Sequence, residues 1–201
     1  TGRVALELAR VGHAVTALDS NAGLLRALRG RAAGLPVATA LADARDFALD
    51  QCFALCLAPM QTAQLLGGPE GRARFLRCAR RHVRGGGTLA AALAGPLEAF
   101  DAEADAAHLP RPDRDEHEGW VYSSQPVAIR RRPGTVEIHR VRRTIGPDGA
   151  RGEARDVVCL DELCAADLER EGMAAGFTPL PRRNISPSRD HVGSTVVMLR
   201  G

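Results

Sequence analysis

Apolar residues recur at helical spacing in three segments of the first hundred residues, and short apolar runs lie between these segments. The helical segments are residues 4–10, 21–33 and 70–83. The strand-like runs are residues 13–19, 37–41, 53–58 and 88–94. Strands that alternate with helices predict an α/β fold with a doubly wound, mostly parallel, Rossmann-like sheet.

The same pattern predicts which side of each element faces the core. In the segment over residues 21–33 the leucines share one helix face, and the arginines lie on the other. In residues 70–83 the apolar side chains are predicted to point inward and the arginines outward. The run FALCLA at residues 53–58 predicts a buried strand that Pro59 ends.

The alternation stops after Gly95-Pro96. Residues 101–118 are polar and acidic, and they predict a loop or a frayed helix. Three strand-like runs separated by turn residues then predict a small antiparallel β insertion at residues 119–131, 135–145 and 154–160. A helix from Asp161 or Glu162 to Ala175 and two strand candidates, residues 178–185 and 192–199, end the chain. We therefore expect a core at residues 1–95, an insertion at residues 96–160 and a core-completing segment at residues 161–201.

Composition excludes several classes of protein. The chain has 201 residues and a net charge of +3, which is too small to indicate nucleic-acid binding without a concentrated basic patch. No apolar run is long enough to span a bilayer, so no membrane partner is expected. All 27 basic residues are arginines, a uniform bias that identifies no particular site. The five cysteines form no C-x-x-C pair, so neither a disulfide framework nor a zinc site is expected, and a reducing, cytoplasmic compartment is favoured.

The first nineteen residues have the pattern of the second half of a nucleotide-binding β-α-β unit. Gly2 opens a helix, a strand follows, and Asp19 ends that strand 17 positions after the glycine. In such units the glycine lets backbone N–H groups approach the ligand, and the acid accepts hydrogen bonds from ribose hydroxyls. The preceding strand and the first glycines are absent from the sequence. We therefore expect that the first strand of the fold is missing from this chain.

The order of these elements resembles that of class I S-adenosylmethionine-dependent methyltransferases. Thr1-Gly2-Arg3 resembles the tail of the glycine-rich first motif, and Asp19 falls where the family's ribose-binding acid ends the second strand. Asp43, in the run ADARD, falls where an acid contacts the adenine amino group. The runs FALCLAPMQTAQLL and GMAAGF resemble the fourth strand with its loop and the turn before a C-terminal antiparallel strand pair.

The resemblance implies S-adenosylmethionine as cofactor and a small-molecule methyl acceptor that the insertion covers. The cofactor-binding residues that it implies are Thr1, Gly2, Asp19, Ser20, Asp43, Ala44, Arg45, Ala58 and Pro59. The candidates for contact with the acceptor are Met60, Gln61, Trp120 and Tyr122. The sequence departs from the family where Ala54, rather than an acid, follows Phe53. It departs again at Met60-Gln61-Thr62, where Asn or Ser is common.

Each candidate also has a structural interpretation. Asp19 could cap the following helix, although Ser20 and Asn21 offer the same hydrogen bonds. Asp43 could cap a short turn, and Pro59 could simply end its strand. Trp120 and Tyr122 share one strand face, where they either pack the insertion onto the core or line an acceptor pocket.

Arginines and histidines in and near the insertion give weaker signals. The arginines either recognise an anionic acceptor or form a solvated surface; they are Arg130, Arg131, Arg132, Arg140, Arg142 and Arg143. The histidines are bases near the pocket mouth or structural residues; they are His117, His139 and His191. No histidine, cysteine or acid set has the spacing of metal ligands.

Methyl transfer from a sulfonium needs positioning more than it needs a catalytic group, so the absence of a triad is expected. A nicotinamide-dependent oxidoreductase is one alternative, because Gly2 and Asp19 also suit that fold. A non-catalytic Rossmann-like binding module is the other. If the first strand is missing, its neighbours have unpaired edges, and residues 1–201 should bind the cofactor more weakly than a chain extended upstream. Equal affinities would refute that expectation.

Overall fold

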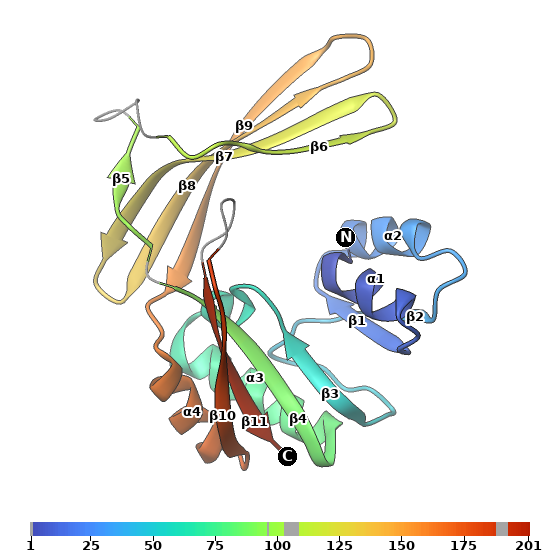
Figure 1. The fold of residues 1–201 in the computed structure, drawn as a ribbon, viewed down its shortest axis with the longest axis vertical. Coiled ribbons are helices and arrows are strands. Elements are labelled where there is room, and N and C mark those ends of the chain that lie inside the picture. The colour runs from blue at the N-terminus through green and yellow to red at the C-terminus, as the bar shows by residue number, and fades with distance from the viewer. Residues whose placement is uncertain (1, 96, 103–108, 188–192) are drawn as a thin grey trace.

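The computed structural model describes residues 2–95, 97–102, 109–187 and 193–201. The N-terminal part consists of α1 (Arg3–Arg10), β1 (Val15–Asp19), α2 (Ala22–Arg31) and β2 (Val37–Leu41). β1 and β2 pair in parallel, and α1 and α2 pack on them (Figure 1). Leu6, Leu28 and Ala32 form a small core there. Leu25 is also buried but Leu24 is 39% exposed, so the leucines of α2 do not all face inward as predicted.

The larger core surrounds a second sheet with the strand order β10-β11-β4-β3. Its strands are β3 (Phe53–Ala58), β4 (Val83–Ala94), β10 (Thr178–Ile185) and β11 (Ser194–Arg200). β3 is parallel to β4, whereas β4, β11 and β10 pair antiparallel, which agrees with the predicted C-terminal strand pair. The 3-10 helix η1 (Thr62–Leu65), α3 (Gly68–His82) and α4 (Ala165–Ala174) pack against this sheet. The chain therefore has an α/β fold with mixed and antiparallel sheets.

The two parallel pairs are separate sheets in the described part of the chain. No backbone pairing joins β1 to β3 there. Two contacts nevertheless link the parts: Gln51 Nε2 donates a hydrogen bond of 3.0 Å to Thr16 Oγ1, and Leu18 packs against the larger core. The expectation of a missing first strand remains a prediction.

β3 is less buried than its apolar sequence predicts. Ala58 is only 1% exposed, but Leu55 is 46% and Leu57 is 37% exposed. Alternate residues of a strand point to opposite faces. Cys56 and Ala58 face the core that α3 covers, while no described residues bury the face of Leu55 and Leu57.

The insertion is a sheet of five strands, rather than the three predicted. Its strands are β5 (Phe100–Asp101), β6 (Asp113–His117), β7 (Trp120–Arg132), β8 (Thr135–Ile145) and β9 (Arg151–Asp161). β6 lies where the sequence predicted a loop or a frayed helix. Its exposed side chains show no alternation of apolar and polar residues, so only backbone pairing with β7 identifies it as a strand.

Arg72 contradicts the prediction that the arginines of α3 point outward. Its side chain is buried, and it binds two acids from distant segments. Arg72 Nη1 lies 2.7 Å from Asp161 Oδ2, at the end of β9, and Nη2 lies 2.7 Å from Glu171 Oε1, in α4. Asp161 Oδ2 also accepts a 2.7 Å hydrogen bond from the Gly68 backbone N–H. Arg72 therefore joins the end of the insertion to the core.

Candidate functional site

Asp19 and Asp43 come from neighbouring parallel strands. Asp19 is the last residue of β1 and is paired in register with Leu41, the last residue of β2, and Asp43 follows two positions later. The Ala42 backbone N–H donates a 3.2 Å hydrogen bond to the Asp19 carbonyl oxygen. Both acids therefore lie at the carboxyl edge of the β1–β2 pair, the edge at which open α/β sheets bind ligands.

Asp19 does not cap α2, which was the structural alternative for this residue. Asn21 Oδ1 caps α2 by accepting hydrogen bonds from Gly23 N at 2.8 Å and Leu24 N at 3.1 Å. Asp19 Oδ1 accepts one hydrogen bond, from Asn21 N at 2.8 Å. The other carboxylate oxygen has no partner among the described residues, so it is available to bind hydroxyl groups.

Asp43 stabilises the short turn that follows it, which was the structural interpretation of this residue. Its Oδ1 accepts a 2.8 Å hydrogen bond from Arg45 N, and its Oδ2 lies 2.7 Å from Arg45 Nη2. The side-chain and backbone hydrogen bonds from Arg45 lower the pKa of Asp43 from about 3.8 to about 2. The carboxylate remains 41% exposed, so it keeps room for a further donor such as an amino group.

This ion pair gives a pH-dependence that can be measured. Arg45→Ala is expected to raise the pKa of Asp43 from about 2 part of the way toward its ordinary value of about 3.8, because the guanidinium donors to the carboxylate are lost while the backbone N–H of residue 45 remains. Since the pKa is lower in the folded state, the stabilising contribution of the pair is present above about pH 4 and is lost as the pH falls toward 2. An NMR titration of the Asp43 carboxyl carbon measures the shift. Arg74→Ala is the matched control, because Arg74 acts on Asp43 only through a weaker charge interaction; equal shifts in both variants would contradict the assignment.

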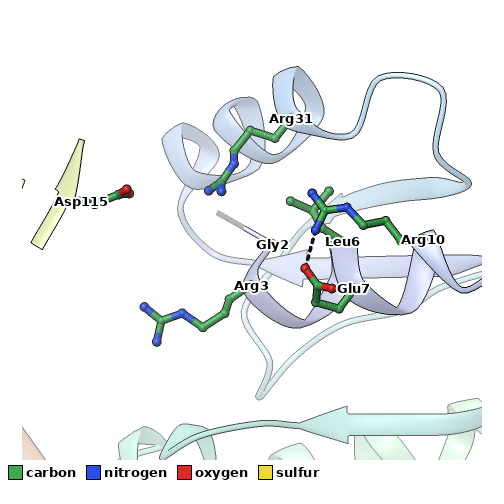
Figure 2. Close-up of a pocket in the computed structure, with 7 residues that line it drawn as sticks. All are labelled: Gly2, Arg3, Leu6, Glu7, Arg10, Arg31 and Asp115. Carbon is green, nitrogen blue, oxygen red and sulfur yellow. Dashed lines mark hydrogen bonds and ion pairs between the residues drawn. The ribbon is translucent and has the colours of Figure 1, made fainter. Parts of the chain in front are cut away.

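The start of α1 borders a hollow of about 220 Å³ (Figure 2). Gly2 has φ +85°, and a Cβ atom there would lie 2.3 Å from Leu28 Cδ1, so both conformation and packing favour glycine. No side chain caps this helix, and its first turn carries no acid, which leaves the first backbone N–H groups without a side-chain acceptor among the described residues. The hollow is lined by Gly2, Arg3, Leu6, Glu7, Arg10, Arg31 and Asp115. Thr1 lies outside the described residues.

The residues after β3 do not line this hollow. Ala58 is buried, and Pro59 follows it with its carbonyl oxygen accepting a 2.7 Å hydrogen bond from Thr62 Oγ1. Met60 has a left-handed backbone, with φ 59°, and is half exposed, and Gln61 is the N-cap residue directly before η1. Pro59 thus ends the strand as predicted, and the turn after it holds Met60 in a conformation unusual for a non-glycine residue.

Trp120 and Tyr122 stack on each other, with ring centroids 6.2 Å apart and an interplanar angle of 21°. They are 41% and 45% exposed and belong to neither hydrophobic core, so the structure gives no support to the interpretation that they pack the insertion onto the core. Neither ring lines the hollow. Exposed aromatic pairs of this kind can contact a small ligand.

The arginines of the insertion are neutralised within their own region. All six predicted members of the cluster have carboxylate partners, in the pairs Arg130–Asp101, Arg131–Glu162, Arg132–Glu137, Arg140–Asp113, Arg142–Asp156 and Arg143–Glu153. His139 Nε2 lies 3.3 Å from Glu137 Oε2, and hydrogen bonds from His139 and Arg132 lower the pKa of Glu137. These pairings favour an ion-paired surface over an anion-binding site. His117 lies 3.7 Å from Glu118, and His191 lies outside the described residues.

The described residues contain neither a disulfide nor a cluster of metal ligands. All five cysteines are free, and no three His, Cys, Asp or Glu side chains in the described part gather as a metal site would require. Among the described helices, none combines the length and the apolar character that a membrane span requires.

Comparisons with known proteins extend these observations. Residues 1–87 match a family model described as a methyltransferase domain. The CcbJ methyltransferase from Streptomyces caelestis has a similar structure, with a TM-score of 0.69 and 20% identity over 100% of this chain and 79% of that chain. The sugar N-methyltransferase KedS8 from Streptoalloteichus sp ATCC 53650 gives a TM-score of 0.68 and 20% identity, over 92% and 71% of the two chains. SAM-bound CalS10, an amino pentose methyltransferase from Micromonospora echinaspora, gives 0.65 and 17%, over 92% and 73%. None of the curated proteins compared with the chain matches it.

Residues 1–87 therefore match a methyltransferase domain, and the whole chain has the fold of solved S-adenosylmethionine-dependent methyltransferases. The resemblance found in the sequence is confirmed. The family match over residues 1–87 and the fold are those of methyltransferases, and solved structures of this fold hold S-adenosylmethionine or S-adenosylhomocysteine. They do not favour the nicotinamide-dependent oxidoreductase or the non-catalytic module.

The positions of two residues were not predicted from the sequence: Asp115, which lines the hollow, and Arg72, which joins the insertion to the core. Asp115 reaches the hollow beside Gly2 although 112 residues separate them, and it comes from the segment predicted to be a loop. Arg72 was assigned to the solvent face of its helix. Neither residue has a signal in local periodicity, because each position depends on contacts with segments far away in the sequence.

Proposed function

We propose that this protein transfers a methyl group from S-adenosylmethionine to an amine or hydroxyl of a small molecule. The observation that carries the proposal is the position of Asp19 and Asp43 at one carboxyl edge of parallel strands, with an unpaired oxygen on Asp19. The left-handed Gly2 at the start of α1 adds uncapped backbone donors. These features fit the ribose, the adenine and the amino-acid end of the cofactor, respectively.

The remaining cofactor-binding candidates follow the two acids in sequence, end β3, or lie at the first residue. Ser20 follows Asp19 and is exposed, and Ala44 and Arg45 follow Asp43 in the turn that its carboxylate holds. Ala58 and Pro59 end β3. Thr1 stays a candidate from the sequence resemblance alone. We propose that the turn at residues 43–46 carries the adenine, because Arg45 keeps the Asp43 carboxylate ionised and oriented.

The bound cofactor supplies an activated methyl group on a positively charged sulfur. The task of this chain is then to hold the acceptor atom in line with that methyl group and to exclude water. Met60 and Gln61 follow the end of β3, and Trp120 and Tyr122 belong to the insertion; we propose these four as acceptor contacts. A hydroxyl acceptor would need a general base, whereas an amine needs only to be neutral when it attacks.

The neighbours of similar fold include a sugar N-methyltransferase and an amino pentose methyltransferase, which supports nitrogen as the acceptor atom here. We further infer that the two parallel pairs belong to one doubly wound sheet, since Gln51 and Leu18 already join them. We also propose that the chain divides at residues 95 and 160 into a core, an insertion and a core-completing segment. The five free thiols support a reducing, cytoplasmic compartment.

Calorimetric titration of the protein with S-adenosylhomocysteine, beside NADH, tests the proposal. Micromolar binding of S-adenosylhomocysteine alone is the expected result. Binding of NADH alone would instead support an oxidoreductase. Binding of neither ligand would support a module that does not catalyse methyl transfer.

A further inference from the structure

One face of the insertion combines aromatic and acidic side chains at the end nearest to α1. In the β6–β7 pairing, Asp115 lies directly opposite Tyr122, and His117 lies opposite Trp120. Residues directly opposite each other in an antiparallel pair share a face, with Cβ atoms about 5 Å apart. Asp115, Tyr122 and Trp120 therefore form one continuous surface, which we name the aromatic–acidic face.

Backbone packing holds the indole in place on this face. A Cβ atom at Gly146 would lie 3.4 Å from the Trp120 ring, so the ring lies close against the chain at the β8–β9 turn. The Tyr122 ring stacks beside it. Two partly exposed, stacked rings offer a surface for the C–H faces of a saturated ring or for a cation.

Asp115 differs from its neighbours in β6 because its carboxylate is unused. Asp113 pairs with Arg140, and Glu116 pairs with Arg114. Asp115 forms no hydrogen bond or ion pair with any residue that the structure describes, yet its side chain points at the hollow that begins at Gly2 (Figure 2). An unpaired carboxylate thus lies between the aromatic rings and the start of α1.

We infer that the aromatic–acidic face binds an acceptor whose amine is carried on a sugar-like saturated ring, with the ammonium on Asp115 and the ring on Trp120 and Tyr122. This inference rests on the proposed function and names its acceptor. A carboxylate that has no other partner prefers a cation to a neutral or anionic group. Arg3 and Arg31 line the other wall of the hollow, so the ammonium is assigned to the Asp115 side. The ammonium gives one proton to solvent water, and the resulting neutral amine attacks the methyl group as S-adenosylhomocysteine leaves.

Trp120 is the only tryptophan in the chain, so its fluorescence reports on this face directly. The probes are glucosamine, N-acetylglucosamine and glucuronic acid, which present a cation, a neutral amide and an anion on similar rings. Saturable fluorescence change with glucosamine, at least tenfold weaker with the other two, is expected. Asp115→Asn should abolish this preference, whereas Glu116→Gln should keep it, because Glu116 points to the opposite face of the same strand.

Equal responses to the three probes, no response to any, or equal losses in the two variants would overturn the inference. Circular dichroism confirms that each variant is folded. The calorimetric titration with S-adenosylhomocysteine is made separately on the wild-type protein. A protein that binds S-adenosylhomocysteine but not glucosamine would keep the proposed function and lose this inference. A protein that binds glucosamine but not S-adenosylhomocysteine would keep the ligand preference of this face and lose both the proposed function and the role of the ligand as methyl acceptor.

Discussion

Asp19→Asn is expected to weaken the binding of S-adenosylhomocysteine roughly ten- to hundredfold, because hydrogen bonds to a charged group contribute about 1.5–3 kcal/mol. The substitution keeps the shape of the side chain and an oxygen that can still accept the hydrogen bond from Asn21 N. It removes the charge and the second strong acceptor that we assign to the ribose. Calorimetric titration measures the change in affinity.

Asp50→Asn is the matched control, since Asp50 is an exposed acid just before β3, far from the carboxyl ends of the strands. Its affinity for S-adenosylhomocysteine should equal that of the wild-type protein. If Asp19→Asn binds as tightly as this control, Asp19 is not a cofactor ligand, and the edge of the β1–β2 pair is not the site.

Arg72→Met is expected to lower the free energy of unfolding by about 3–5 kcal/mol, the usual cost of removing one partner of a buried ion pair. The substitution leaves Asp161 and Glu171 without their shared cation, although their side chains are only 18% and 21% exposed. Since Asp161 ends β9 and Glu171 lies in α4, the loss affects the junction between the insertion and the core. Urea unfolding followed by circular dichroism gives the change.

Arg77→Met on the exposed side of the same helix controls for the loss of an arginine from α3, and it should change stability by less than about 0.5 kcal/mol. Arg72→Lys separates charge from geometry. It keeps the positive charge but cannot form the paired hydrogen bonds from Nε and Nη2 to Glu171, so an intermediate loss is expected. Equal stability of Arg72→Met and Arg77→Met would show that the network contributes nothing.

Local sequence predicted most of the helices and strands in the first hundred residues. The spacing of apolar residues identified α1, α2 and α3, and short apolar runs identified β1 to β4. The acid that ends β1 and the acid after β2 were also predictable, because strand ends and turn residues are properties of short segments. Parallel pairing of β1 with β2 then places those acids at the same edge without any long-range information.

Pairing between strands decided what periodicity could not. The segment Asp113–His117 has no alternation, yet it becomes β6 because β7 offers free backbone groups along its edge. Leu55 and Leu57 belong to an apolar run that predicted burial, but burial depends on what covers each face of the sheet. The sequence of a strand does not contain that information.

The sequence by itself determined the class of fold, the likeness to methyltransferases, and the two acids proposed for the cofactor. Only the tertiary structure decided that Arg72 faces Asp161 and Glu171, which follow it by 89 and 99 positions. It also decided that Asp115 lies beside both Gly2 and the stacked pair of Trp120 and Tyr122. The physical reason is that periodicity and turns record interactions between near neighbours, whereas charge pairing and pocket walls arise between segments that meet only after the chain has folded.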